Sequence, residues 1–208
     1  TSRGYEKEEI WNNYFNSVSQ PPLTEDMIEG RKLANLNYRN ISINGFYKEG
    51  SLLLDNRTYR NQKGYEVFSF FESENNKIYL VNRGWISKKQ RYLIDPPQGM
   101  KQIEGLYSPF IRFGLALTKT PDQEDFPLVL QELTYIKASS YLEKNIKLEP
   151  TVIQLSASSS GSLEPIWKPS VLKASRHWAY AFQWFGLAIV LIYLYVFFGY
   201  KQGKNKYE

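Results

Sequence analysis

The sequence predicts an α+β protein in which a mainly antiparallel, barrel-like β-sheet domain with short helices precedes a C-terminal transmembrane α-helix. Three observations carry this prediction. Short runs of alternating apolar and polar side chains follow one another from residue 38 to residue 86. Residues 177–200 contain no Asp, Glu, Lys or Arg. The mean hydropathy of the whole chain is nonetheless −0.47, so residues 1–176 should form a water-soluble unit, long enough for one domain core.

The first element predicted along the chain is a short amphipathic helix. Residues 4–19 place Ile10, Tyr14 and Phe15 at helical spacing, and two prolines follow. The chain begins at Thr1 without Met or an apolar leader, and we expect an export signal or a first transmembrane helix upstream.

Strands are predicted next, because the period of the apolar residues changes to two. In the first run, Ile41, Ile43 and Gly45 alternate with polar residues. Turn residues at 49–50, 61–64 and 73–76 separate the runs and suit hairpin or meander connections. The predicted strands cover a segment from Tyr38, then Ser51–Asp55, Gly64–Phe71, Lys77–Ile86 and Lys101–Tyr107. They favour a closed or nearly closed antiparallel sheet.

The second half of the domain shows a less regular pattern. Residues 131–144 place apolar side chains on one weakly apolar face, which predicts a helix. Alternation returns in Thr151–Leu155 and predicts another strand. The polar stretch SASSSGS at residues 156–162 predicts a flexible loop.

The uncharged span is long enough for a membrane crossing. The 23 residues after His177 would form a helix of about 34 Å, and a bilayer core is about 30 Å thick. The predicted organisation is therefore an extracytoplasmic α+β domain over residues 1–176, a transmembrane helix over 177–200 and a basic cytoplasmic or matrix tail over 201–208.

The distribution of charge excludes a nucleic-acid partner and supports membrane lipid as one. The formal net charge is +5, yet residues 1–167 hold 20 basic and 20 acidic side chains. The whole excess flanks the span, where anionic lipid attracts it. Three cations precede the span and three follow it, so charge alone leaves the orientation tied. Because long domains cross membranes largely regardless of charge, the short tail is the natural cytoplasmic segment.

Catalytic motifs are missing from the sequence, and we expect no enzyme. No GxSxG elbow, P-loop, GxGxxG or HExxH is present. The chain has no Cys and a single His, which argues against a zinc or copper site with several protein ligands.

Two long segments nevertheless resemble a known family. Val81–Ile86, VNRGWI, and residues 176–187, RHWAYAFQWFGL, match characteristic segments of the Surfeit locus protein 1 family of cytochrome c oxidase assembly factors. Weaker matches lie at Gly45–Phe46, Gly64–Val67, Gly105–Leu106, Trp167 and Pro169. The family's first transmembrane helix has no counterpart in this sequence.

The resemblance implies a role in building the metal centres of haem-copper oxidases. It implies cytochrome c oxidase subunit I as a partner, with haem a synthase and other assembly factors as further partners. It places the domain in the bacterial periplasm, anchored in the inner membrane, or alternatively in the mitochondrial intermembrane space. It also implies that His177 matches a histidine proposed to bind haem.

The helix face around His177 suits such a contact. A neutral imidazole is a common ligand of haem iron, and helical spacing places His177 with Tyr180 and Trp184 on one face. Ala181 and Ala188 on that face leave room for a flat macrocycle or another helix. The predicted cofactor is a transiently bound haem a. The alternative is that these rings only form an interfacial anchor belt.

Arg83 is the remaining candidate binding residue. Its guanidinium at a strand end would suit a haem propionate or an acidic partner. In the structural alternative, Gly84 allows a β-bulge and the Trp85 ring packs in the core. Arg83 then forms a salt bridge or caps backbone carbonyls. Two functions therefore stay open: delivery of haem a to oxidase subunit I, or a scaffold that stabilises assembly intermediates without binding haem.

Overall fold

The computed structural model describes residue 16 and residues 20–31, 36–115, 126–167 and 174–204 of the chain. Side chains are described in these ranges except at 91–93, 174–181 and 198–204. The chain divides into two compact units, one spanning residues 14–168 and the other containing the C-terminal helix. The helix predicted over residues 4–19 lies outside the described residues, apart from the single residue 16.

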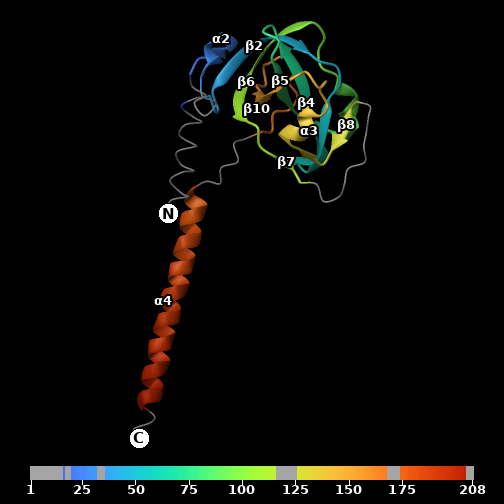
Figure 1. Ribbon diagram of the computed structural model, residues 1–208. Coiled ribbons are helices and arrows are strands. Elements are labelled where there is room, and N and C mark those ends of the chain that lie inside the picture. The colour runs from blue at the N-terminus through green and yellow to red at the C-terminus, as the bar shows by residue number, and fades with distance from the viewer. Residues whose placement is uncertain (1–15, 17–19, 32–35, 116–125, 168–173, 205–208) are drawn as a thin grey trace. The chain divides into compact units, whose positions relative to one another are not determined.

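The larger unit is built on a five-stranded barrel (Figure 1). Its strands pair in the order β2-β6-β10-β5-β4, and β4 pairs back with β2 to close the sheet. All of these pairs are antiparallel except β10 with β5. The barrel strands are β2 (Asn40–Tyr47), β4 (Gln62–Ser73), β5 (Ile78–Ser87), β6 (Met100–Pro109) and β10 (Leu148–Leu155).

Closure of the barrel depends on a close approach at Gly45. This residue of β2 pairs with Ser73 of β4. A Cβ added at Gly45 would lie within 2.0 Å of the Glu72 carbonyl oxygen, so only glycine lets the two backbones pair here. The strand β4 is long enough to pair with β3 (Leu52–Tyr59) along its first half and with β2 at its end.

Alternating apolar side chains of all five strands fill the barrel interior. The cluster in the interior includes Ile41, Phe71, Val81, Ile103 and Ile153, one from each strand, and all are nearly inaccessible to solvent. Burial of apolar surface on this scale is the main stabilising contribution to such a fold. Leu53, Tyr65, Val67, Ile86 and Ile94 form a smaller cluster.

A second layer covers the outer face of β4, β5 and β10. It consists of β7 (Phe113–Gly114), β8 (Leu128–Leu130), β9 (Glu132–Leu133) and α3 (Tyr135–Ser139), which pack there together with side chains of β3. Phe68, Leu80 and Val152 of the barrel pack here against side chains of the added elements. The short helix η2 (Lys88–Leu93) contacts β4 and β5. The strand β8 extends the sheet beside β3 in parallel, and β7 pairs with β9.

At the opposite edge of the sheet, β1 (Leu23–Thr24) pairs in parallel with β2 and leads directly into α2 (Glu25–Ile28). Leu23 and Ile28 are buried against the same cluster that fills the barrel, so this short segment is held by both main-chain pairing and apolar contact.

The predicted strands are all confirmed, with longer bounds in several cases. The predicted helix over residues 131–144 is wrong in extent. Its first part is the strand β9, and only Tyr135–Ser139 is helical, after Thr134 accepts a hydrogen bond from the Lys137 N–H at 3.2 Å. The turn predicted at residues 61–64 is also displaced: Arg60 and Asn61, both with positive φ, form the hairpin turn, and Gly64 lies inside β4.

The C-terminal unit contains the helix α4, Ala174–Lys204. A helix at this place in the chain is therefore confirmed. Its predicted role as a membrane span is not supported, because no helix within the described residues is long and apolar enough to cross a membrane. Within residues 182–197, most of the large apolar side chains are exposed.

Candidate functional site

The segment VNRGWI forms the second half of β5 and contains a β-bulge. Val67 of β4 pairs with Gly84, and the next residue of β4, Phe68, pairs with Asn82, so Arg83 is the extra residue. Gly84 has a φ of 111°, a conformation that other residues rarely adopt. A bulge re-aims the side chains around it, and here it places Asn82 and Arg83 in different surroundings.

Past the bulge, β5 exchanges its partner. The strand β10 pairs with β5 as far as Asn82, and residues 161–167, which we call the strap, then take its place. The Trp85 N–H donates to the Glu164 carbonyl at 2.6 Å, and the Glu164 N–H donates back at 3.2 Å. The Leu163 N–H donates to the Arg83 carbonyl at 2.7 Å. The motif thus holds the strap by its main chain.

Arg83 fastens the strap with its side chain as well. Its Nε donates to the Gly161 carbonyl at 2.7 Å, Nη1 to the Ile94 carbonyl at 2.5 Å and Nη2 to the Asp95 carbonyl at 3.3 Å. Only 3% of the residue is exposed. The guanidinium therefore links the strap to the segment that follows η2. These contacts match the structural alternative for Arg83, in which its side chain caps backbone carbonyls.

Burial changes the ionisation of Arg83 and of its neighbour Tyr47. The guanidinium lies 5.8 Å from the centre of the Tyr47 ring. Desolvation lowers the pKa of Arg83, while Tyr47 and Asp95 act in the other direction. Burial raises the pKa of Tyr47 to about 12, and the charge of Arg83 opposes part of that rise. The Tyr47 hydroxyl donates to the Ser160 carbonyl at 2.9 Å, so Tyr47 also holds the backbone immediately before the strap.

A row of buried polar side chains crosses β4, β5 and β10 beside the bulge. Asn82 Nδ2 donates to Glu66 Oε1 at 2.6 Å and to Gln154 Oε1 at 2.7 Å. The other oxygen of Glu66 lies 2.9 Å from Arg57 Nε in an ion pair. Asn82 Oδ1 accepts from the Gly84 N–H at 3.0 Å, so the row also supports the bulge. Gln154 Nε2 is buried and has no partner among the described residues.

Two hollows flank the strap. The larger, of about 370 Å³, is lined by Tyr59, Arg60, Gln62, Trp85, Ile86, Gln90, Leu163 and Glu164. Across it, the Tyr59 hydroxyl donates to Glu164 Oε1 at 2.8 Å. The smaller, of about 160 Å³, is lined by Asn82, Gly84, Leu106, Gln154, Leu155, Ser156, Ala157, Pro165, Ile166 and Trp167. The motif residues thus contribute to both hollows.

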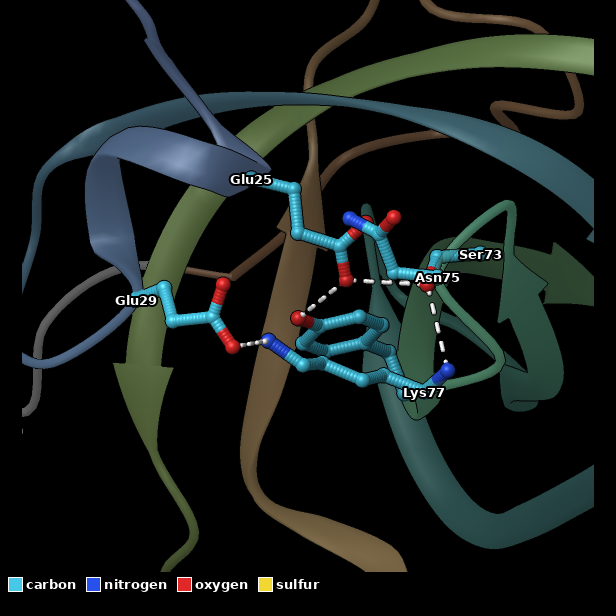
Figure 2. Close-up of polar contacts among 6 residues, drawn as sticks. Glu25, Glu29, Ser73, Asn75 and Lys77 are labelled. Atoms are coloured by element: carbon cyan, nitrogen blue, oxygen red, sulfur yellow. Dashed lines mark hydrogen bonds and ion pairs between the residues drawn. The ribbon is translucent and has the colours of Figure 1, made fainter.

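A second polar cluster lies where α2 meets the β4–β5 hairpin (Figure 2). The buried carboxylate of Glu25 accepts from Ser73 Oγ at 2.8 Å and from the Tyr79 hydroxyl at 2.9 Å through one oxygen, and from Asn75 Nδ2 at 3.0 Å through the other. Glu29 lies at the rim, 3.5 Å from Lys77 Nζ. Neutral donors rather than a cation bind the Glu25 carboxylate, and they hold α2 against the β4–β5 hairpin. We call this cluster the latch.

The polar loop predicted at residues 156–162 is tied down by hydrogen bonds rather than free. Ser156 N–H donates to the Glu104 carbonyl at 2.9 Å, and Ser159 Oγ accepts from the Glu104 N–H at 2.8 Å. The stretch thus leads from the end of β10 into the strap, and its hydrogen bonds to Glu104 hold it against β6.

The four site residues predicted from the sequence fall in both units. Arg83 lies in the barrel unit, whereas His177, Tyr180 and Trp184 lie in α4. Trp184 is 71% exposed. The side chains of His177 and Tyr180 lie outside those described. Sequence reasoning did not find Glu66, Asn82 and Gln154; Asn82 stands in the quoted motif, but no pattern marks the other two.

Together these features define a small barrel protein in which one motif holds a connecting strap through main-chain and guanidinium contacts. The chain is similar to proteins of one known family. The family model described as the SURF1 family matches residues 1–189. A SURF1-like protein of Rickettsia bellii (strain RML369-C) is 29% identical over 194 residues, covering 87% of this chain and 77% of the relative. A SURF1-like protein of Rickettsia felis (strain ATCC VR-1525 / URRWXCal2) is 30% identical over 194 residues, covering 88% of this chain and 84% of the relative.

The chain belongs to the SURF1 family. The resemblance carried by VNRGWI and RHWAYAFQWFGL is thereby confirmed.

Proposed function

We propose that this protein is an assembly factor for haem-copper cytochrome c oxidase, acting without catalysis of its own. The family match over residues 1–189 carries this proposal, because it includes both the barrel and the first part of α4. The architecture around the motif supports it: the motif's polar groups hold neighbouring backbone in place, which suits a protein that presents a surface rather than one that transforms a substrate.

We propose further that the protein accepts haem a from haem a synthase and delivers it to oxidase subunit I. His177 would ligate the iron, and Tyr180 and Trp184 would flank the macrocycle. The exposed ring of Trp184 suits such a contact. Arg83 does not fit a propionate site, because its guanidinium is 3% exposed and already donates to three carbonyls. The proposed contact therefore rests on α4.

The experiment is to co-express the full chain with haem a synthesis enzymes, purify it and record visible spectra. Haem delivery predicts a haem a band that is lost in His177→Ala and retained in Trp178→Phe, a matched change of the next residue. Absence of the band from the unaltered protein would count against haem a as cargo. A band of equal strength in His177→Ala would exclude His177 as the ligand.

A scaffold that binds subunit I without haem is the second candidate. The observation that favours it is the use of Arg83, Trp85 and Glu164 in internal contacts that stabilise the strap. The scaffold predicts that His177→Ala associates with subunit I as the unaltered protein does. Co-purification of tagged subunit I with each variant separates the two functions.

The location that we propose is the bacterial inner membrane with the barrel in the periplasm; the mitochondrial inner membrane with the barrel in the intermembrane space is the alternative. The uncharged sequence of residues 177–200 and its basic flanks support attachment to lipid. Protease protection in sealed membrane vesicles of each orientation tests the side on which the barrel lies.

A further inference from the structure

Three exposed aliphatic side chains lie at one end of the barrel unit. Ile136 of α3 is 81% exposed, more than any other large apolar side chain among the described residues of that unit. Ile111 and Leu115, which stand on either side of β7, are 46% and 63% exposed. The strand β7 pairs with β9, which leads through Thr134 into α3, and Figure 1 shows β7 and α3 near the same end of the barrel. We call Ile111, Leu115 and Ile136 the end face.

Aromatic rings support the end face from behind. The Phe110 ring packs edge-on against the Phe113 ring at 6.0 Å and against the Tyr135 ring at 5.6 Å. Phe113 is buried, whereas Phe110 and Tyr135 are half-buried. Because Ile111 follows Phe110 and Ile136 follows Tyr135, this ring contact brings the two exposed isoleucines near each other.

The chain leaves the barrel unit at the same end. Trp167 packs against the same core cluster as Phe110 and Tyr135, and the barrel unit ends at residue 168. Nine residues then separate Trp167 from the uncharged sequence of residues 177–200. A chain of that length spans at most about 36 Å. Any surface that holds residues 177–200 is therefore within reach of the end of the barrel that contains Trp167.

The charges around the end face permit contact with anionic lipid. Residues 110–115 and 131–149 hold four cations and three carboxylates, which are Arg112, Lys137, Lys144, Lys147, Glu132, Glu143 and Glu149. Arg112 and Glu132 form an ion pair at 2.7 Å, and Glu149 is half-buried at the start of β10. Lys144 and Lys147 are exposed, as is Glu143. The remaining balance is slightly basic, and anionic headgroups attract such a surface.

We propose that the end face lies on a lipid surface, with Ile111, Leu115 and Ile136 inserted between the lipids and the half-buried rings of Tyr135 and Trp167 at the level of the headgroups. Aromatic side chains with a polar group are typical of that level. The proposal rests on the attachment of residues 177–200 to lipid that is proposed above. The short connection to those residues favours lipid over a protein partner, because it keeps the end face within reach of the lipid that they contact.

The test uses single cysteines that carry a polarity-sensitive fluorophore, since the chain has no cysteine of its own. Ile111→Cys and Ile136→Cys report on the end face. Met100→Cys is the matched control: Met100 is apolar and 50% exposed, but it lies at the start of β6, whereas Ile111 follows the end of that strand. Each labelled full chain is reconstituted into vesicles of phosphatidylcholine and phosphatidylglycerol and floated on a density gradient. We expect lipid with brominated acyl chains to quench the labels at residues 111 and 136 and to leave the label at residue 100 bright.

The two readouts separate this proposal from the attachment on which it rests. Vesicles that float with the protein while the label at residue 136 stays bright would overturn the proposal and leave the attachment intact. Failure of the protein to float would overturn both. Equal quenching at residues 136 and 100 would show that no end of the barrel prefers lipid. A label at residue 136 that is shielded from brominated lipid and from aqueous iodide alike would show that protein covers the end face, which would also overturn the proposal.

Discussion

Gly84 lies so close to Glu164 that a Cβ added to it would stand 2.5 Å from the Glu164 carbonyl oxygen. That carbonyl is the acceptor for the Trp85 N–H, so the contact lies at the centre of the link between β5 and the strap. A side chain at residue 84 would have to break this link or distort the bulge. The glycine of the motif is therefore required for strap attachment as well as for its backbone conformation.

We predict that Gly84→Ala lowers the free energy of unfolding by about 3 kcal/mol or more, because strain at positive φ adds to a backbone clash. Urea unfolding followed by tryptophan fluorescence measures the change. Gly99→Ala is the matched control: Gly99 also has positive φ, 78°, but no atom lies within 4 Å of its added Cβ. It should cost about 1 kcal/mol. Equal costs for the two variants would contradict the proposed contact.

We predict that Arg83→Met lowers the free energy of unfolding by about 3 kcal/mol or more, because the Gly161, Ile94 and Asp95 carbonyls lose a charged donor. Limited proteolysis should then cut residues 156–167 faster. Arg60→Met removes the same charge from an exposed turn, where the guanidinium lies over the Tyr59 ring at 5.0 Å, and should cost about 1 kcal/mol at most. A strap as resistant in Arg83→Met as in Arg60→Met would show that Arg83 does not hold it.

The sheet could be predicted because its interior imposes a period of two on the sequence. Ile41 and Ile43 point into the barrel with Ser42 between them, and this alternation recurs in the other strands. The bounds were harder to predict. β3 continues from Leu54 to Tyr59 with polar residues, since that part projects as a hairpin with β4 and leaves the apolar core.

The segment 131–144 could not be divided correctly from its own sequence. Glu132 and Leu133 become a strand because Phe113 and Gly114, far away in the chain, pair with them. Thr134 then caps a new helix of only five residues. Apolar spacing within the segment is compatible with one continuous helix, and only the distant pairing decides against it.

The candidate site could be predicted only where a long motif marks it. Arg83 stood out within VNRGWI, but its partners are backbone carbonyls, which leave no pattern in the side chains. Gln154 sits in a run of buried strand residues, and the alternation that predicts the strand does not show that its amide lacks a partner. The same limit applies to Glu25, whose three donors come from β4, β5 and their turn.

We predict that Glu25→Gln lowers the free energy of unfolding by about 2 kcal/mol, because one carboxylate oxygen becomes a donor and faces donors already in place. Glu29→Gln is the matched control. The Glu29 side chain is 70% exposed and 3.5 Å from Lys77 Nζ, so its loss should cost less than about 0.5 kcal/mol. Thermal unfolding of the three proteins checks this difference, and a Glu29→Gln cost as large as that of Glu25→Gln would refute the latch.

The same latch affects the ionisation of Tyr79. Burial raises the pKa of the Tyr79 hydroxyl well above its usual range, and the charge and hydrogen bond of Glu25 raise it further. We predict that Glu25→Gln lowers the Tyr79 pKa, since the neutral amide no longer opposes the phenolate. The 13Cζ signal of labelled tyrosine, followed by NMR against pH, reports this. An unchanged titration would mean that Glu25 does not contribute to the raised pKa of Tyr79.

Alkaline pH should weaken the attachment of the strap through Tyr47. Burial raises the pKa of Tyr47 from 10.0 to about 12, so the folded state holds its proton more tightly than the unfolded state. The resulting stabilisation is fully present below pH 10 and is lost as the pH rises through about 12.

Tyr47→Phe removes both the hydrogen bond to the Ser160 carbonyl and this titration. We therefore predict that the variant is about 1 kcal/mol less stable at pH 8 but loses less stability between pH 10 and pH 12. The difference in absorbance at 295 nm between the two proteins should show the ionisation of one tyrosine with a midpoint near pH 12. A midpoint near pH 10 would contradict the prediction. It would show that Tyr47 ionises as a solvated phenol and that its hydroxyl contributes little to holding the strap.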